Sequence, residues 1–298
     1  AKSKKIIAVG NKAKKMLGKT PEDIEVTRPI RNGVISDYIM TERMLKIYVK
    51  SAIAKRKIWG KPNICVCVPS GVTDVQRRAA CDAVYRTGAK NVYVLEEPFA
   101  AAIGAGVDIE SAVGAMVVDI GAGTTDIAIV ARGGVQHSSS IKIGGDDFDE
   151  AIIRYMRKRH NVLLGESSAE QLKKDIGSVY PREQDAIGYA RGKELVRGLP
   201  TKMAVKSSEM IEACQEETDQ ILDSVREMLE AAPPELVSDI SEHGIILAGG
   251  GSKIFGMDKL IMDKIGVPVV NIKNPDQVVA TGAGTAHYYI KDGRTLEE

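Results

Sequence analysis

The stretch Met116-Val-Val-Asp-Ile-Gly-Ala-Gly-Thr-Thr-Asp-Ile-Ala-Ile-Val130 decides the fold, because a buried strand runs into a glycine turn and directly out into a second strand. Gly121 and Gly123 allow a sharp bend and a close backbone approach to a ligand. The exposed amides of such a turn form an anion-binding nest, and the threonines that follow add hydroxyl donors. We therefore interpret Gly121-Ala122-Gly123-Thr124 as a phosphate-binding turn.

Asp119 stands at the end of the first apolar run, where we expect its carboxylate to face a metal ion that bridges the bound phosphates. The turn leads into a strand, whereas the glycine loops of the dinucleotide-binding and Walker motifs both open a helix. The pattern therefore disfavours both of those motifs.

The composition is that of an ordinary globular protein, with 298 residues of which 44% are apolar and 27% charged. This length exceeds one comfortable core, so we expect two domains. Lys and Arg number 41 against 40 Asp and Glu, a net charge of +1 that argues against a nucleic-acid partner.

No stretch is apolar enough to span a membrane or to serve as a signal peptide, which predicts a cytoplasmic protein. The four cysteines lack a Cys-x-x-Cys pair and the four histidines are scattered, which disfavours a zinc site.

Helices alternate with short apolar strands along the chain, a pattern typical of an α/β architecture. The expected elements include a helix capped by Thr41 and running toward Lys55, strands over 63–68 and 91–95, a helix opened by a capping box at Thr73 and Gln76, and one long helix over 207–230. A second hairpin at 132–134 extends the phosphate hairpin to three antiparallel strands, which lead to a helix starting near Gly145. The polar stretch 108–114 is the expected domain boundary.

Glu97 is the candidate catalytic residue, because it lies where the strand over 91–95 meets a helix opened by Pro98. Strand ends are where α/β folds place their ligands. A carboxylate there could orient a water molecule in line with a terminal phosphate. A glutamate that only caps the helix beside its positive dipole end is the alternative.

A second glycine turn, Gly249-Gly250-Gly251-Ser252, follows a strand and removes side chains where a flat ring or a ribose can lie against the backbone. We expect Ser252 to open the next helix. Glu170 and Lys173 are three residues apart on one predicted helix face, where they could hold ribose hydroxyls and the adenine edge. The alternative is an ordinary surface ion pair.

Further short motifs occur in one order along the chain. They are Ala8-Val-Gly10, Arg28-Pro-Ile-Arg-Asn-Gly-Val-Ile-Ser-Asp37, Glu96-Glu-Pro-Phe-Ala-Ala-Ala-Ile-Gly104, Ile143-Gly-Gly-Asp-Asp-Phe-Asp149, Pro233-Pro-Glu-Leu-Val-Ser-Asp-Ile240 and Ala280-Thr-Gly-Ala-Gly284. With the two glycine turns they make the chain resemble the actin, heat-shock chaperone and sugar-kinase superfamily. Within that superfamily it resembles the MreB/Mbl family of bacterial actin homologues over essentially its whole length.

The resemblance implies an actin-like ATPase fold of class α/β, with two related ribonuclease H-like domains and a nucleotide cleft between them. Domain I would comprise 1–109 with 275–298, and domain II 110–274 with a small subdomain at about 161–230. ATP and Mg²⁺ are the implied cofactors. The implied roles are phosphate binding by Gly121 to Thr124, metal contact by Asp119, water positioning by Glu97, and nucleoside binding by Glu170, Lys173 and Gly249 to Ser252.

The function implied is that of a filament-forming ATPase that organises cell-wall synthesis and maintains rod shape. Its partners would be further copies of itself, the cell-wall synthesis machinery and the inner face of the cytoplasmic membrane. Ile58 and Trp59 follow three basic residues and are the expected membrane contact, the alternative being a tryptophan packed on its own domain. The alternative hypothesis is a non-polymerising or chaperone-like ATPase of the same superfamily. A sugar kinase would need a catalytic aspartate and a sugar pocket that the motifs do not provide.

Three departures from the family pattern are visible. The superfamily opens with an Asp-x-Gly-Thr hairpin and this sequence starts after that point, so we expect a truncated sequence whose 298 residues bind nucleotide weakly. Ala122 replaces a usual glycine and Asp126 a usual glutamate, which should leave binding intact. The run Lys173-Lys174-Asp175 alters the usual lysine and glutamate spacing on the nucleoside helix.

Overall fold

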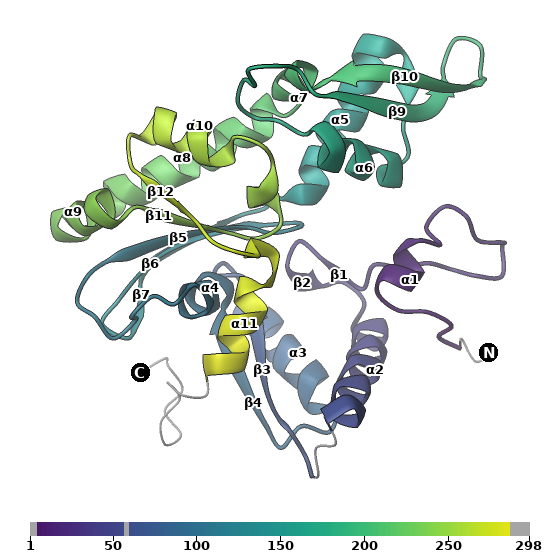
Figure 1. Ribbon diagram of the computed structural model, residues 1–298. Coiled ribbons are helices and arrows are strands. Elements are labelled where there is room, and N and C mark those ends of the chain that lie inside the picture. Colours follow the sequence, from purple (N-terminus) through teal and green to yellow (C-terminus); the bar gives the residue numbers. More distant parts are fainter. Residues whose placement is uncertain (1–4, 57–59, 287–298) are drawn as a thin grey trace.

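The computed structural model describes residues 5–56 and 60–286 (Figure 1). Ile58 and Trp59 lie outside the described residues. The α-helices are α1 (Asn11–Lys14), α2 (Tyr38–Arg56), α3 (Asp74–Tyr85), α4 (Glu97–Ala105), α5 (Gly145–His160), α6 (Glu166–Ile176), α7 (Ser207–Ala213), α8 (Gln215–Ala231), α9 (Pro234–His243), α10 (Met257–Ile265) and α11 (Val278–Thr285). The strands are β1 (Ile30–Arg31), β2 (Val34–Ile35), β3 (Asn63–Val68), β4 (Asn91–Glu96), β5 (Ala115–Ile120), β6 (Thr125–Ala131), β7 (Gly134–Ile141), β8 (Val162–Leu163), β9 (Ile187–Glu194), β10 (Pro200–Lys206), β11 (Ile245–Ala248) and β12 (Val269–Asn271).

The largest sheet has the strand order β12-β11-β5-β6-β7. β11 runs parallel to both β12 and β5, whereas β5, β6 and β7 are antiparallel, which confirms the three-stranded meander predicted from the sequence. Met116 and Val118 of β5 join one hydrophobic cluster, and Val117 joins another on the opposite face. Figure 1 shows α8 and α10 above this sheet and α4 and α11 below it. Both faces are covered, which explains why β5 and β6 are apolar without alternation.

Helices α4 and α11 pack against each other at glycines, although they lie far apart in the sequence. A Cβ atom added to Gly282 would lie 1.7 Å from the carbonyl oxygen of Ala100, and one added to Gly104 would lie 2.0 Å from that of Val278. Only glycine permits this backbone approach. α4, which begins at Glu97, also packs against β5 and β6 of the large sheet.

A three-stranded sheet, β10-β9-β8, lies with α5, α6 and α7 in the upper part of Figure 1. The prediction of one long helix over 207–230 is wrong, because the helix breaks at the buried Cys214, whose φ and ψ are −102° and 6°. The break lets α7 pack against α5 while α8 lies against β6 and β7.

Two local expectations have different outcomes. The capping box at Thr73 and Gln76 is present at the start of α3 and confirms that prediction. Thr41 does not cap α2, so that prediction is wrong. Asp37 accepts a hydrogen bond from the Met40 amide (3.0 Å), and the Thr41 hydroxyl instead donates to the Pro29 carbonyl (3.1 Å).

The proposed division into domains at 109/110 and 274/275 stays a prediction, as does the nucleotide cleft between them. Within residues 5–56 and 60–286, no helix combines the length and the apolar character that crossing a bilayer requires.

Candidate nucleotide site

The predicted phosphate turn joins β5 to β6. The Gly121 amide donates to the Thr124 carbonyl (2.8 Å) and closes the turn. Among the described residues, the amides of Ala122 and Gly123 meet no hydrogen-bond acceptor. Because an unpaired backbone donor is costly unless water or a ligand accepts from it, these two amides are available to an anion.

The start of α5 sets the direction in which those two amides point. The Gly145 amide donates to the Gly121 carbonyl (2.9 Å), and the Asp146 amide donates to the Ala122 carbonyl (2.7 Å). In a trans peptide the C=O and the following N–H point in opposite directions. The N–H groups of Ala122 and Gly123 therefore point away from α5.

The turn between β1 and β2 packs against the phosphate turn at Gly123. A Cβ atom added to Gly123 would lie 2.9 Å from the amide nitrogen and Cα of Asn32. Asn32 has φ of 47° and is followed by Gly33, which is the dipeptide typical of a tight hairpin turn. The Asn-Gly pair indicates the turn but not its neighbour in the fold, so this contact was not predicted from the sequence.

Asp119 and Asp126 are directly opposite each other in the β5–β6 pairing and are 4% and 1% exposed. Asp126 accepts a hydrogen bond from the Ser70 amide (2.9 Å) through Oδ1, while its buried Oδ2 has no partner among the described residues. Glu97 is the first residue of α4 and adds a third acid to this group, which we call the acid cluster: Glu97, Asp119 and Asp126.

Burial and mutual repulsion raise the pKa values of the acid cluster. Burial, followed by the charges of Asp126 and Asp119, raises the pKa of Glu97 to about 8. Burial and the Asp126 charge raise the pKa of Asp119 to about 7. Burial also raises the pKa of Asp126, although the Ser70 amide lowers it in part. The charges that act on Glu97 and Asp119 are other carboxylates, so a cation bound here would stabilise the ionised forms.

The second glycine turn lies directly beside Asp119. A Cβ atom added to Gly249 would lie 2.4 Å from Asp119 Oδ1 and 2.2 Å from the Ile120 carbonyl oxygen. Gly249 has φ of 79° and its amide donates to the Pro275 carbonyl (2.9 Å). The structure therefore brings the two glycine turns and Asp119 together.

Ser252 does not open a helix of the length expected. It lies in a short 3₁₀ turn, Gly251–Lys253, and its hydroxyl donates to the Gly249 carbonyl (2.8 Å). The following α-helix, α10, begins only at Met257, after Gly256 in the left-handed conformation. The expectation that Ser252 opens that helix is therefore wrong.

Glu170 and Lys173 of α6 do not pair with each other. Glu170 accepts from Lys14 (2.6 Å) and Lys174 (2.7 Å), and although burial raises its pKa, these lysines bring it down to about 2. The Lys173 ammonium lies 2.9 Å from Asp149 Oδ1 and also donates to the Gly145 carbonyl.

Asp149 and Lys14, the partners of these two residues, were not among the candidates from the sequence. Burial raises the pKa of Asp149 to about 6, and Lys173 opposes this shift. Lys14 and Glu170 are 156 positions apart in the chain. No local pattern connects partners at such a separation.

The donor set at Asp119 fits a nucleotide-bound Mg²⁺ ion. In the described part of the chain, no three His, Cys, Asp or Glu side chains are arranged to hold a metal ion by themselves. Mg²⁺ is commonly held by one or two carboxylates together with phosphate oxygens and water. One buried carboxylate beside two free turn amides meets that requirement.

Four features together define an actin-like fold. They are a mixed sheet covered on both faces, a phosphate turn between antiparallel strands, a second glycine turn beside it, and an acidic residue at the start of a helix. The chain matches the family model described as "MreB/Mbl protein" over residues 1–295. It belongs to the MreB/Mbl family, and it is a bacterial cytoskeletal actin-like protein.

Individual relatives agree with this assignment. The cell shape-determining protein MreB of Escherichia coli (strain K12) is 46% identical over 283 residues, covering 95% of this chain and 82% of that protein. The cell shape-determining protein Mbl of Bacillus subtilis (strain 168) is 41% identical, covering 95% and 84%. The crystal structure of MreB5 of Spiroplasma citri bound to ADP superimposes with a TM-score of 0.90 at 35% identity, covering 96% of this chain and 85% of that one. A MamK double helical filament structure, at 23% identity and a TM-score of 0.78, shares the fold.

Proposed function

We propose that this protein binds ATP with Mg²⁺ and hydrolyses it slowly, and that binding and hydrolysis control its assembly into filaments. The free amides of Ala122 and Gly123 beside the acid cluster carry this proposal, because they offer an anion site next to a cation site. Solved structures of the related MreB5 hold ADP and AMPPNP, which supports an adenine nucleotide here.

Each residue has a distinct part in the proposed reaction. The two amides hold phosphate oxygens, and Asp119 holds the Mg²⁺ ion, which supplies positive charge to the phosphates when bound. Glu97 orients the attacking water. At neutral pH the pKa of about 8 keeps Glu97 mostly protonated, and a cation beside it favours the carboxylate that can accept a hydrogen bond from water.

Two substitutions separate binding from hydrolysis. We expect Glu97→Gln to retain ADP affinity in calorimetry but to release phosphate at least about tenfold more slowly. We expect Asp119→Asn to lose the Mg²⁺-dependent part of its nucleotide affinity. Unchanged phosphate release in the first variant, or unchanged Mg²⁺ dependence in the second, would contradict these roles.

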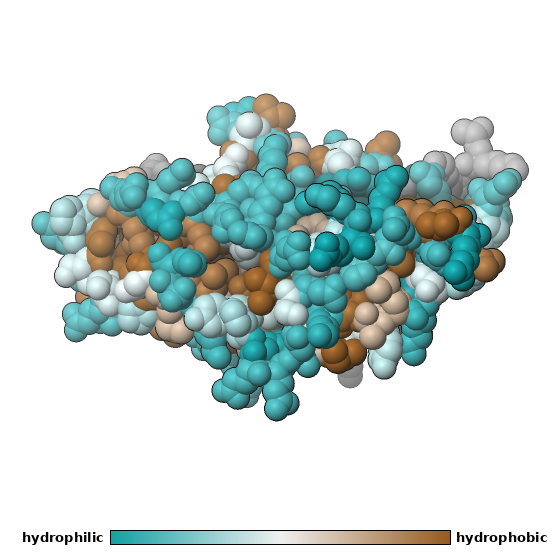
Figure 2. Space-filling view, turned by 90° about the horizontal axis from the view of Figure 1, so that it is seen from above, coloured by the Kyte–Doolittle hydropathy of each residue, from teal (hydrophilic) through white to brown (hydrophobic). Residues whose placement is uncertain are grey.

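The self-association proposal is supported by an exposed apolar hairpin tip. The β9–β10 hairpin ends in Leu195, Val196 and Leu199, which are 42%, 78% and 58% exposed. Arg197 lies in the same tip, is exposed, and has its Nε 3.8 Å from the carboxylate of Glu194. Figure 2 shows hydrophobic residues gathered toward both ends of the face seen from above.

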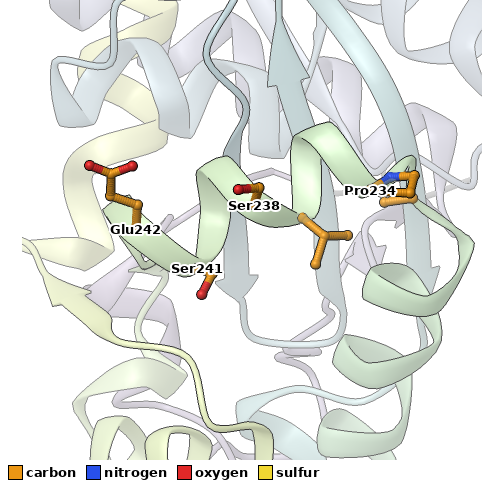
Figure 3. A pocket seen from close by; sticks show the side chains of 6 residues that line it. Pro234, Ser238, Ser241 and Glu242 are labelled. Carbon is orange, nitrogen blue, oxygen red and sulfur yellow. The ribbon is translucent and has the colours of Figure 1, made fainter.

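A groove on α9 lies at the other end of the molecule (Figure 1). It is shallow and open to solvent, has a volume of about 660 Å³ and is lined by Ala232, Pro234, Val237, Ser238, Ser241 and Glu242. Figure 3 shows the labelled side chains of this groove following one another along α9. Glu235 and Glu242 are exposed and make this helix acidic.

The apolar hairpin tip with its exposed Arg197 suits the α9 groove of a second copy, which combines apolar residues with the acidic Glu242. Because the two surfaces differ and lie at opposite ends, such a contact is head-to-tail, and a head-to-tail contact that does not close into a ring produces a filament. We propose this as the assembly contact.

Sedimentation with ATP and Mg²⁺ tests this contact. Val196→Glu should abolish pelletable polymer, whereas Val75→Glu, which changes an equally exposed valine (75%) on α3, should not. Arg197→Glu should weaken assembly, and combining it with Glu242→Lys should restore it. Normal assembly of the Val196 variant, or no restoration in the charge-reversed pair, would refute the contact.

We also propose that the filament lies at the inner face of the cytoplasmic membrane and guides the cell-wall synthesis machinery. The sequence basis for the membrane contact is Ile58 and Trp59 beside Lys55 and Lys57. Liposome co-sedimentation tests it. Changing Ile58 and Trp59 to serine should abolish binding to anionic vesicles without changing the melting temperature, and retained binding would refute the contact.

A further inference from the structure

We infer that Lys173 is a positioning residue, which together with Asp149 braces the phosphate turn through the first residues of α5. The inference rests on the proposed nucleotide binding. It gives Lys173 a different role from the ribose contact expected from the sequence.

The Lys173 ammonium makes two contacts with α5, an ion pair with Asp149 and a hydrogen bond to a backbone carbonyl. It lies 2.9 Å from Asp149 Oδ1 and donates to the carbonyl oxygen of Gly145. The side chains of Lys173 and Asp149 are only 13% and 11% exposed. An ion pair this far out of solvent is screened little, so it constrains its partners more than an exposed pair does.

Gly145 connects this ammonium to the phosphate turn. Its carbonyl accepts from Lys173, and its amide donates to the Gly121 carbonyl (2.9 Å). Gly144 packs tightly at the same point, since an added Cβ atom would lie 2.6 Å from the carbonyl group of Ala122. A shift of the α5 start is therefore transmitted directly to the turn.

The brace matters because α5 sets the direction of the free amides. The carbonyls of Gly121 and Ala122 point toward α5, so the following amides point away from it, toward the proposed anion site. If Lys173 releases Gly145, the α5 start gains freedom and those amides lose their fixed direction. Preorganised donors bind an anion better than mobile ones, because no ordering is needed on binding.

The neighbouring Lys174 provides a matched control. It lies on the same helix, its side chain is 61% exposed, and it pairs with Glu170 and not with α5. Lys174→Met therefore removes the same charge from the same helix and leaves the brace in place.

Hydrogen exchange of the nucleotide-free protein tests the brace without requiring any ligand. We expect the Gly145 and Asp146 amides to exchange about tenfold faster in Lys173→Met and in Asp149→Asn, and at the wild-type rate in Lys174→Met. Wild-type exchange at both amides in Lys173→Met would overturn the inference.

The affinities for ADP and adenosine distinguish a brace from a ribose contact. If Lys173 acts as a brace, Lys173→Met and Asp149→Asn should each weaken ADP binding about tenfold. Adenosine binding should be unchanged, because adenosine has no phosphate for the turn to hold. A ribose contact predicts that Lys173→Met weakens both ligands equally and that Asp149→Asn weakens neither, and that result would overturn the inference. If the wild-type protein binds no ADP, the proposed function fails, while the exchange measurement still decides the brace.

Lys173→Met leaves Asp149 buried without its partner, and this variant could fail to fold. The double variant Lys173→Met with Asp149→Asn removes both charges and avoids that problem. It still lacks a donor for the Gly145 carbonyl, so we expect its Gly145 and Asp146 amides to exchange faster than in the wild type. Wild-type exchange in the double variant would overturn the brace through Gly145.

Discussion

Replacing Glu97 with glutamine should stabilise the nucleotide-free protein at neutral pH. Glu97 has a pKa of about 8 in the folded protein, against an ordinary value of 4.5. A carboxyl group whose pKa is raised by folding contributes its full stability below pH 4.5 and loses it as the pH rises toward 8. Folding thus holds a proton on Glu97 that the unfolded chain releases.

The size of the effect follows from these two values. Between pH 4.5 and pH 8, each pH unit lowers the free energy of unfolding by about 1.4 kcal/mol. At pH 7 the accumulated loss is on the order of 3 kcal/mol, and an uncharged glutamine does not suffer it. We therefore expect Glu97→Gln to raise the free energy of unfolding at pH 7 by up to about 3 kcal/mol and to have little effect near pH 4.

Urea denaturation at pH 4, 5.5 and 7 measures this difference for the wild type and Glu97→Gln. Glu110→Gln, which removes an exposed carboxylate from the loop before β5, is the matched control and should change stability by less than about 0.5 kcal/mol at every pH. A Glu97→Gln effect that is the same at pH 4 and pH 7, or a loss of stability at pH 7, would refute the reasoning. Such a result would mean that burial and carboxylate repulsion do not control this residue.

Three further outcomes are expected from the same structure. Asp119→Asn should likewise raise the free energy of unfolding of the nucleotide-free protein between pH 5 and pH 7, because the pKa of Asp119 is raised to about 7, and denaturation at these two pH values checks it. Gly144→Ala should lower the free energy of unfolding by about 2 kcal/mol or more and weaken ADP binding in calorimetry, because the added Cβ atom would clash with the backbone of the phosphate turn. A Cβ atom added to Gly134 meets nothing within 4 Å, so Gly134→Ala should be tolerated. Gly282→Ala should lower the melting temperature severely, because α11 must separate from α4, and Gly165→Ala, which meets no neighbour, should not.

Local patterns predicted the fold well where a strand or cap depends on neighbouring residues. The β5–β6–β7 meander and the capping box at Thr73 follow from apolar runs, glycine turns and side-chain spacing, all of which act over a few positions. The break at Cys214 was missed because the apolar period continues through it. Packing of α7 on α5 and of α8 on the sheet decides that break, and sequence spacing does not record it.

The site was predictable as a set of separate pieces but not as an arrangement. Glycine turns and a carboxylate at a strand end are visible in the sequence, because their backbone requirements restrict the residue type. The pairing of Lys173 with Asp149 could not be predicted from the sequence. Asp149 lies on another helix, where it is one of several acidic residues in the first turns. The cap position expected for Thr41 failed for the same reason, because Pro29 competes for its hydroxyl.

The arrangement of the site gives a physical reason for nucleotide and metal to bind together. The free amides of the phosphate turn attract an anion, but the carboxyl groups of the acid cluster lie at the same strand and helix ends, and each of them that is ionised repels the anion. A cation alone would gain from the carboxylates but would have only Asp119 and water as ligands. Each ligand therefore removes the main obstacle to the other, and because such coupling is reciprocal, Mg²⁺ should strengthen nucleotide binding by the same factor as nucleotide strengthens Mg²⁺ binding. The acid cluster therefore lowers the stability of the ligand-free protein at neutral pH, and it also couples the binding of nucleotide to the binding of Mg²⁺.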